Sequence, residues 1–281
     1  MISIKYEGNN NTIDLMNTPN LVLSNHTGLD QPISETITLS NPNLRGTQYQ
    51  RSQISDRPIS LTFTVYDVDR TRYKLMSVFK SGEKGVLTIS NEFREGKIEC
   101  VFEEMAFDMF SNPTTCTIFL RSPYPYFTGL ESIINELDNV IENFVLEAFI
   151  DETEGIVFGE IVSEHSITID NESDVESGLT IEITASETVV NPVIHNVTTN
   201  KFIGVNYTMN TGDKLTITTG TGKKKITLER AGVTANLINK LTRGSTFFQL
   251  QRGENILRSE ASTGGNTMIV YVTYVNEYEA I

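Results

Sequence analysis

Four acidic side chains alternate with other residues in one short stretch, and carboxylate oxygens are the ligands that a hard cation such as Ca²⁺ prefers. They are Asp170, Glu172, Asp174 and Glu176. The stretch lacks the spacing and the sixth-position glycine of an EF-hand loop. We interpret it as a solvated acidic loop, with calcium binding as the alternative, and we predict no metal site.

Other residues that could support catalysis do not form a recognisable motif. His26, His165 and His195 have no metal-ligand spacing among them, and no serine, cysteine or histidine motif of catalytic type occurs. The stretch 220–225 is rich in glycine and lysine, but Lys224 stands where a phosphate-binding loop needs Ser or Thr, and a strand pattern follows. The sequence predicts a hairpin turn there, no catalytic residue, no cofactor and no enzymatic activity.

The two cysteines, Cys100 and Cys116, lie in apolar, strand-like stretches, which favours buried free thiols over a disulfide. The chain has 281 residues, enough for two domains. It contains no run of 18 apolar residues, so we expect no membrane span. Its first residues lack the features of a signal peptide, so we expect synthesis in the cytoplasm.

The net charge of −14 is concentrated in one segment. Between Ser122 and Asn200 there are sixteen Asp and Glu residues and no Lys or Arg, whereas the remainder has 20 acids and 22 bases. Binding to phosphates needs clustered Lys and Arg. The charge pattern therefore disfavours nucleic-acid binding along the chain.

The C-terminal stretch 206–281 indicates which elements position these residues. Apolar and polar residues alternate there, as at Leu215/Ile217 and Ile226/Leu228, and glycine-containing turns recur every roughly 9–12 residues. Alternation with a period of two buries one face of a strand and leaves the other in water. This pattern predicts an antiparallel β-sandwich or jelly roll, with Phe248 and Leu250 in one of its strands.

The N-terminal part also predicts strands, with one helix among them. The strands are expected at 2–6, 21–24, 34–39, 59–65, 86–90, 97–107 and 114–121. A helix at about 70–80 begins with Asp69 as its N-cap, places Tyr73, Met76 and Phe79 in the core, and ends before Gly82. The protein class is therefore mainly β.

Two segments stand apart from these patterns. Residues 40–58 are polar and rich in turn-forming residues, without periodicity, which indicates either a flexible loop or an arm that becomes ordered against another subunit. Residues 131–144 carry apolar residues at the spacing of an amphipathic helix, from Ile133 to Phe144. We interpret this second segment as a linker helix, with a partner-binding helix as the alternative.

Several spaced motifs resemble bacteriophage distal tail proteins, which are baseplate hub components of long, non-contractile tails. In the C-terminal half they include Asn206-Tyr207-Thr208, Thr211-Gly212-Asp213, Gly253-Glu254-Asn255 and a closing Val275-Asn276-Glu277-Tyr278. In the N-terminal half, Pro58-Ile-Ser-Leu-Thr-Phe63 and Ser122-Pro-Tyr-Pro-Tyr-Phe127 are similar to the same family. The family likeness is strongest from residue 202 onward.

The resemblance implies a two-domain fold. Residues 1–128 would form a ring-forming N-terminal domain, β-sandwich or split-barrel-like, with one α-helix and a protruding arm at about 40–58. A linker with a short helix would cover 129–148, and residues 149–281 would form a galectin-like antiparallel β-sandwich. Within the arm and at its end, the oligomer interface would include Arg45, Gln48, Tyr49, Gln50, Arg51, Gln53 and Arg57.

The resemblance also implies a function in the virion, at the tail tip, for a protein made in the bacterial host. Six copies would form a ring that joins the tail tube protein to the tail-associated hub protein and lets DNA pass without specific binding. A receptor-binding protein is a further candidate partner. The alternative function is a carbohydrate-binding module for attachment to the host cell wall.

Overall fold

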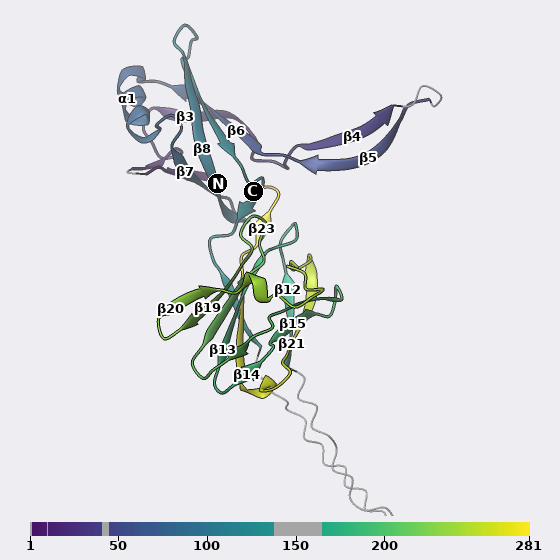
Figure 1. The fold of residues 1–281 in the computed structure, drawn as a ribbon. Helices are drawn as coiled ribbons and strands as arrows, with labels where there is room; N and C mark the ends of the chain where they lie inside the picture. Colours follow the sequence, from purple (N-terminus) through teal and green to yellow (C-terminus); the bar gives the residue numbers. More distant parts are fainter. Residues whose placement is uncertain (1, 10, 41–44, 138–164) are drawn as a thin grey trace, which may run out of the picture. The chain divides into compact units, whose positions relative to one another are not determined.

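The computed structural model describes residues 2–9, 11–40, 45–137 and 165–281 of the chain. Contacts divide it into two compact units (Figure 1). Unit 1 consists of Met1–Glu131 together with Glu277–Ile281, and unit 2 consists of Ser132–Asn276. Unit 2 is therefore inserted, in sequence, between two parts of unit 1. The last five residues, which we had expected in the C-terminal sandwich, belong to unit 1.

Unit 1 contains a nine-stranded sheet, and all its strand pairs are antiparallel. The main path runs β2-β1-β7-β8-β9-β6-β3, while β10 pairs with both β8 and β23. The strands are β1 (Ser3–Glu7), β2 (Thr12–Asp14), β3 (Leu21–Thr27), β6 (Arg57–Val65), β7 (Lys84–Ser90), β8 (Glu95–Asp108), β9 (Thr115–Ser122), β10 (Phe127–Thr128) and β23 (Glu277–Tyr278). Two further strands, β4 (Ser34–Ser40) and β5 (Thr47–Ile54), form a separate two-stranded sheet.

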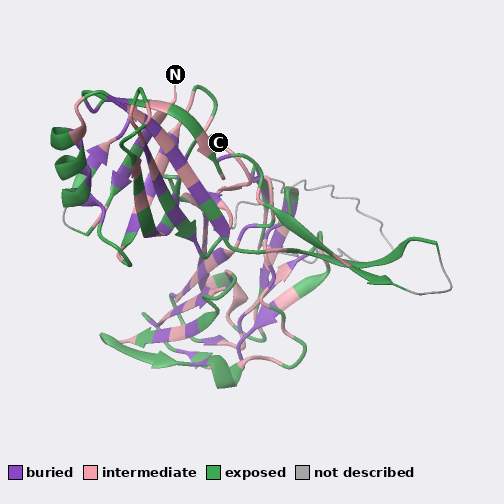
Figure 2. Cartoon of the chain, turned by 90° about the horizontal axis from the view of Figure 1, so that it is seen from above, coloured by how far each residue is buried: buried purple, intermediate pink, exposed green. Residues whose placement is uncertain are grey.

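The core of unit 1 lies on one face of the large sheet. Along β6, buried residues alternate with less buried ones, so that Ile59, Leu61 and Phe63 all point into the core. Figure 2 shows this alternation as bands of buried and less buried residues along the strands. The opposite face carries small hydroxyl side chains, and Thr62 and Thr117 lie within hydrogen-bonding distance there, at 3.1 Å.

The α-helix in the described part of unit 1 packs one side against this core. Helix α1 spans Val68–Val78, and its N-cap is Asp67, whose carboxylate accepts a hydrogen bond from a backbone N–H of the first turn. The expected cap, Asp69, lies inside the first turn. Phe79 follows the helix and stacks on Tyr6 of β1, with 4.2 Å between ring centroids. Tyr73 and Met76, which we expected in the core, are 74% and 46% exposed, because Thr71, Leu75 and Val78 form the buried side of α1.

Unit 2 is an antiparallel β-sandwich, as the alternation predicted. One sheet has six strands in the order β11-β22-β13-β18-β19-β20, and the other has four in the order β12-β21-β15-β16. Their bounds are β11 (Ile133–Leu137), β12 (His165–Asn171), β13 (Leu179–Ala185), β15 (Val193–Asn196), β16 (Lys201–Gly204), β18 (Lys214–Thr218), β19 (Lys225–Arg230), β20 (Val233–Asn236), β21 (Gly253–Glu260) and β22 (Met268–Tyr274). The short pair β14 (Val189–Val190) and β17 (Thr208–Met209) and the 3₁₀ turns η1 (Ile238–Lys240) and η2 (Gly265–Thr267) complete the unit.

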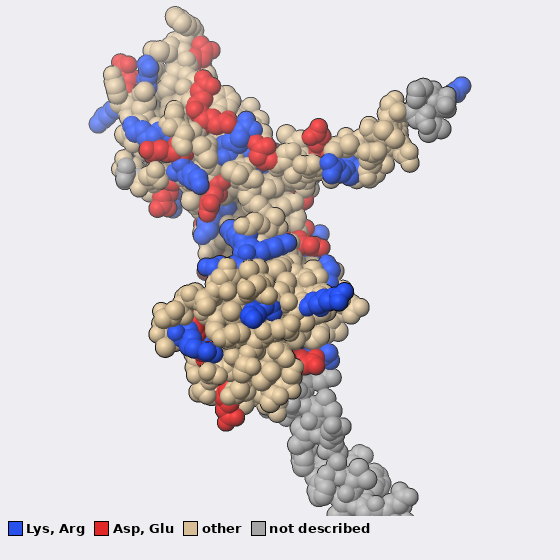
Figure 3. Space-filling view, viewed as in Figure 1, with Lys and Arg blue, Asp and Glu red and all other residues tan. Residues whose placement is uncertain are grey.

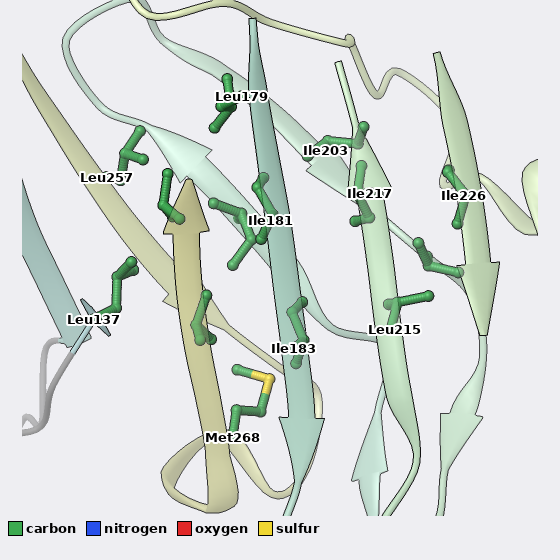
Figure 4. Close-up of a cluster of buried hydrophobic side chains, with 14 of the residues drawn as sticks. Leu137, Leu179, Ile181, Ile183, Ile203, Leu215, Ile217, Ile226, Leu257 and Met268 are labelled. Carbon is green, nitrogen blue, oxygen red and sulfur yellow. The ribbon is translucent and has the colours of Figure 1, made fainter. Parts of the chain in front are cut away.

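The two sheets of unit 2 share one hydrophobic core. Ile181 of β13 and Ile217 of β18, in the larger sheet, belong to the same buried cluster as Ile203 and Leu257 of the smaller sheet (Figure 4). All four side chains are at most 1% exposed. Their burial removes apolar surface from water, at roughly 25 cal/mol per Å², and this is the main force holding the sheets together.

Two sequence expectations in unit 2 differ from the structure. Residues 133–137 of the expected linker helix form strand β11, which pairs with β22 from Ile133↔Tyr274 to Leu137↔Val270. Residues 138–144 of that helix lie outside the described residues. Phe248 and Leu250 are buried as expected, but they lie in a loop, where Leu250 forms an isolated bridge with Ser177.

An ion pair in unit 2, between a buried carboxylate and a part-exposed guanidinium, predicts a pH dependence of stability. Asp213 is 2% exposed and binds Arg230 through two nitrogens, at 2.9 Å to Nε and 2.5 Å to Nη2. The hydrogen bond from Arg230 lowers the pKa of the Asp213 carboxyl. A lowered folded-state pKa contributes stability that is complete above the unfolded value of about 3.9 and is lost as pH falls through the folded value.

We therefore expect Asp213→Asn to lower the melting temperature of unit 2 at pH 7. The difference from the wild type should shrink as the pH is lowered below about 3.9, because the wild-type carboxyl then becomes protonated. Thermal unfolding followed by circular dichroism between pH 7 and pH 2 measures this. The control is Glu187→Gln, which alters an exposed carboxylate. A difference that stays constant over this pH range would contradict the assignment.

Candidate functional site

The two-stranded sheet of unit 1 is the candidate functional site, and we call residues 34–54 the ribbon. Strands β4 and β5 pair in antiparallel register from Ser34↔Ile54 to Ser40↔Thr47. The register shifts between Ile37↔Arg51 and Thr38↔Tyr49, which leaves Gln50 as an extra residue in a β-bulge. The segment that we expected as an arm at 40–58 is therefore one strand of a hairpin that begins at residue 34.

The ribbon has no core of its own. Every described residue of β4 and β5 is exposed except Ile37 and Ile54, which are intermediate, and neither strand pairs with any other described strand. Neither hydrophobic cluster includes a residue of the ribbon. An isolated two-stranded hairpin is marginally stable in water, and open strand edges readily pair with other chains. The ribbon is thus suited to contact another protein.

The two faces of the ribbon carry different side chains. Cross-strand pairs place Ile37 with Arg51 and Leu39 with Gln48 on one face, while Tyr49 lies opposite Thr38 on the other. Leu39 is 51% exposed and Tyr49 is 61% exposed. Tyrosine is enriched at protein–protein interfaces, where its ring is buried and its hydroxyl finds a partner.

Charge is sparse on the ribbon. Among residues 34–54 the charged side chains are Glu35, Arg45 and Arg51, and Figure 3 shows most of this surface without charge. Interfaces are depleted of charged residues at their centres. An uncharged polar surface with a few exposed apolar side chains therefore fits a protein partner better than nucleic acid.

The structure brings together six of the seven expected interface residues. Arg45, Gln48, Tyr49, Gln50, Arg51 and Gln53 all lie on the ribbon and are exposed. Arg57 does not join them, because it begins β6 and is 2% exposed. Sequence reasoning missed Ile37 and Leu39, which lie on the partner strand, and their alternation was the signal that could have identified them.

The alternating acidic stretch 170–176 forms the outer side of a loop. Asp170, Glu172 and Glu176 are exposed, whereas Asn171 and Ser173 between them are buried. The buried residues make the local hydrogen bonds, such as Asn171 Nδ2 to the carbonyl oxygen of Leu250 at 3.1 Å. Among the described residues, no three His, Cys, Asp or Glu side chains form a group that could hold a metal ion.

The glycine- and lysine-rich turn, the two cysteines and His195 all have local contacts or burial that explain them structurally. Residues 220–223 form a turn between β18 and β19, closed by the Lys223 N–H donating to the carbonyl of Gly220 at 2.9 Å. Cys100 and Cys116 are buried free thiols, and burial raises the pKa of each to about 12. His195 Nε2 lies 3.2 Å from a carboxylate oxygen of Glu260. No helix among the described residues is long and apolar enough to cross a bilayer.

These observations define a class of protein: a two-unit β protein whose most distinctive exposed element is a ribbon suited to protein contacts. Comparison with known proteins identifies one domain of the chain. Residues 172–278 match the family of siphovirus-type tail components, C-terminal domain. No match is found among curated proteins.

Solved structures with the same fold extend the likeness to the whole chain. The Dit protein of phage SPP1, described as a paradigm of the hub adsorption apparatus in phages that infect Gram-positive bacteria, aligns with a TM-score of 0.69 and 12% identity, covering 99% of both chains. A chain of the phage P2 baseplate in its activated conformation with Ca aligns with a TM-score of 0.53 and 11% identity, covering 100% of both. A chain from the phage p2 baseplate in its activated conformation with Sr aligns with a TM-score of 0.52 and 9% identity, covering 100% of both chains.

Over residues 172–278 this chain carries the C-terminal domain of siphovirus-type tail components. Its fold over nearly the whole length is that of SPP1 Dit. The resemblance to distal tail proteins that the sequence motifs indicated is thus confirmed, as is the mainly β fold. The protein is a Dit-like structural component of a phage tail and hence a part of the virion.

Proposed function

We propose that this protein is a distal tail protein that assembles into a ring of six copies through unit 1, with the ribbon contacting the neighbouring copy. The observation that carries the proposal is the ribbon itself, which is paired, exposed on both faces and without a core. Heterologous contacts between identical copies form a closed ring when the rotation between neighbours closes. The proposed interface consists of the six ribbon residues already named together with Ile37 and Leu39.

The proposed ring connects two other tail components. One side meets the tail tube protein, the other side meets the tail-associated hub protein, and the sandwich of unit 2 supports a receptor-binding protein. DNA passes through the opening without specific binding. Residues 1–121 carry 14 Asp and Glu against 12 Lys and Arg, so the ring domain has no excess of positive charge with which to bind phosphates.

The proposed role is structural, and no chemical reaction is part of it. We propose synthesis in the bacterial host and incorporation during tail assembly. Unit 1 forms the ring domain, and unit 2 forms the sandwich, which begins with β11 at Ile133.

The alternative, a carbohydrate-binding module, is not favoured by unit 2. Sugar sites need an exposed aromatic ring for stacking, and the large apolar side chains most exposed on the described part of unit 2 are aliphatic: Ile134, Val197, Val233, Ile238 and Ile269. A glycan array probed with the full-length chain tests this alternative. Saturable binding to one class of cell-wall saccharide would support it.

Light scattering and negative-stain imaging of the purified chain, with and without the tail tube protein of the same phage, test the proposed ring. We expect particles with a mass near six times the 31.4 kDa of one chain and a central opening, formed alone or on the tube protein. Particles that remain single chains under both conditions would contradict the proposal.

A further inference from the structure

The chain ends with five residues that return from unit 2 to unit 1, and they dock beside both roots of the ribbon. We call Glu277–Ile281 the tail. Its strand β23 pairs with β10 through Phe127↔Tyr278 and Thr128↔Glu277. Tyr124 Oη donates a 2.5 Å hydrogen bond to the Glu277 carboxylate. The tail is therefore an ordered part of unit 1.

The end of the tail is held from two sides. The side chain of Ile281 is partly buried and packs against the core of unit 1, beside Gly96, where an added Cβ atom would lie 2.4 Å from the Ile281 Cδ1. The Ile281 N–H donates to the carbonyl oxygen of Leu29 at 3.4 Å, and Leu29 is itself 1% exposed. Leu29 belongs to the loop that leads into the ribbon. The tail thus contacts the first root of the ribbon directly.

Arg57 connects the tail to both roots of the ribbon. It lies three positions after the end of β5, and its Nη1 donates to the carbonyl oxygens of Gly28 and Asp30, at 3.2 Å each. Its Nη2 donates to the carbonyl oxygen of Glu279 at 2.7 Å. The guanidinium also lies over the Phe127 ring, 4.7 Å from the centroid. A planar guanidinium offers several donors in fixed directions, so one side chain can hold three segments.

The loop of the first root has little freedom of its own. Gly28 has a φ of +78°, and a Cβ at this position would lie 2.1 Å from the carbonyl oxygen of Pro58. The loop therefore lies directly against the start of β6, where Arg57 and Pro58 form the second root. Because the ribbon makes no core contacts, its direction depends on how these two roots are held.

We propose that the tail is a latch for the ribbon: by binding Arg57 and Leu29 it fixes both roots and so sets the direction in which the ribbon points. The consequence is an order of events. A growing chain cannot present a fixed ribbon until unit 2 has been made and the last five residues have docked. The importance of the latch for assembly rests on the proposed ring, because a ribbon held in one direction loses less conformational freedom when it binds a neighbour.

The test measures the ribbon in the single chain and does not depend on ring formation. Spin labels on Thr38→Cys in the ribbon and Tyr73→Cys on α1 report one distance distribution within unit 1. Both positions are exposed, and the native thiols are buried, so the label is selective. Measurements are made on the full chain at a concentration where light scattering shows single chains.

We expect a narrow distribution for the otherwise unchanged chain. Arg57→Met and a chain lacking residues 279–281 should each broaden it at least about twofold, because freed roots let the ribbon sample more directions. Arg70→Met is the matched control and should leave the width unchanged, because Arg70 is an exposed arginine of α1 that belongs to neither root and not to the tail.

If either variant unfolds unit 1, Arg57→Lys replaces it, because lysine keeps the charge but cannot hold three acceptors in a fixed plane. An unchanged width in folded variants would overturn the latch. Unfolding of the Arg57→Lys variant would also overturn the latch, because the tail would then stabilise the whole of unit 1 and not the ribbon in particular. A different result would contradict the proposed ring. In that case the chains would stay single in the presence of the tail tube protein, while the distance distribution would still broaden in the variants.

Discussion

Shortening the ribbon converts the assembled protein into folded single chains. Replacing residues 35–53 by a short glycine linker removes both strands of a sheet that shares no core with the remainder of unit 1. We therefore expect the melting temperature of unit 1 to change little, while particles on the tail tube protein are lost. Light scattering measures the mass, and circular dichroism reports the fold.

Point substitutions distinguish the contribution of the ribbon's side chains from that of its backbone. Leu39→Ser combined with Tyr49→Ser removes two exposed side chains, one on each face, and keeps the hairpin. If these side chains are central to the interface, the pair should weaken association by about 2 kcal/mol or more, which is roughly a thirtyfold change in the association constant. Phe93→Ser, at a turn position that is 90% exposed, is the matched control and should have no effect. Six-copy particles that persist in the shortened chain would show that the ribbon does not hold the ring together.

Removal of one core phenylalanine should destabilise one unit and spare the other. Phe63 in unit 1 is 0% exposed and Phe248 in unit 2 is 1% exposed, and they belong to separate hydrophobic clusters. Each Phe→Ala substitution leaves a cavity and costs about 3–5 kcal/mol. Scanning calorimetry should show two transitions, with a downward shift on the order of 10 °C in the transition of the substituted unit.

The control for this experiment is Phe93→Ala, which removes an exposed ring and should change stability by no more than about 0.5 kcal/mol. Because unit 2 is inserted into unit 1, the ends of unit 2 also constrain unit 1. A single transition that moves equally with either substitution would show that the two units unfold together, contrary to this expectation.

Local patterns in the sequence determined most of the strands and the family. Alternation at Leu215/Ile217 and Ile226/Leu228 placed these side chains in the core, because successive strand residues point to opposite faces whatever the partner strand is. The turn at 220–223 was predicted from its glycines and from the absence of the Ser or Thr that a phosphate-binding loop requires, and the structure has a turn there. The spaced motifs after residue 202 were sufficient to indicate distal tail proteins, as the match of residues 172–278 confirms.

The helix boundaries were predicted less well, for a reason that lies in tertiary packing. Asp67 and Asp69 are both able to cap a helix, and the chain direction at the end of β6 selects Asp67. Tyr73 fits a helical stripe with Phe79, but the surface available on the sheet is covered by Leu75 and Val78. Spacing along a helix defines a possible face, and only the packed sheet decides which face is buried.

Three features were decided only by contacts between distant parts of the chain. Ile133–Leu137 has a helical pattern, yet it is a strand because β22 offers it a partner edge more than a hundred residues away. Arg57 looks like a surface residue of a polar arm, yet it is buried because the carbonyl of Glu279, 222 positions later, accepts its hydrogen bond. Residues 277–281 belong to unit 1 because they contact residues far away in the sequence, among them Arg57. A helix satisfies its backbone within its own sequence, whereas a strand edge and a buried cation depend on partners that no local pattern reveals.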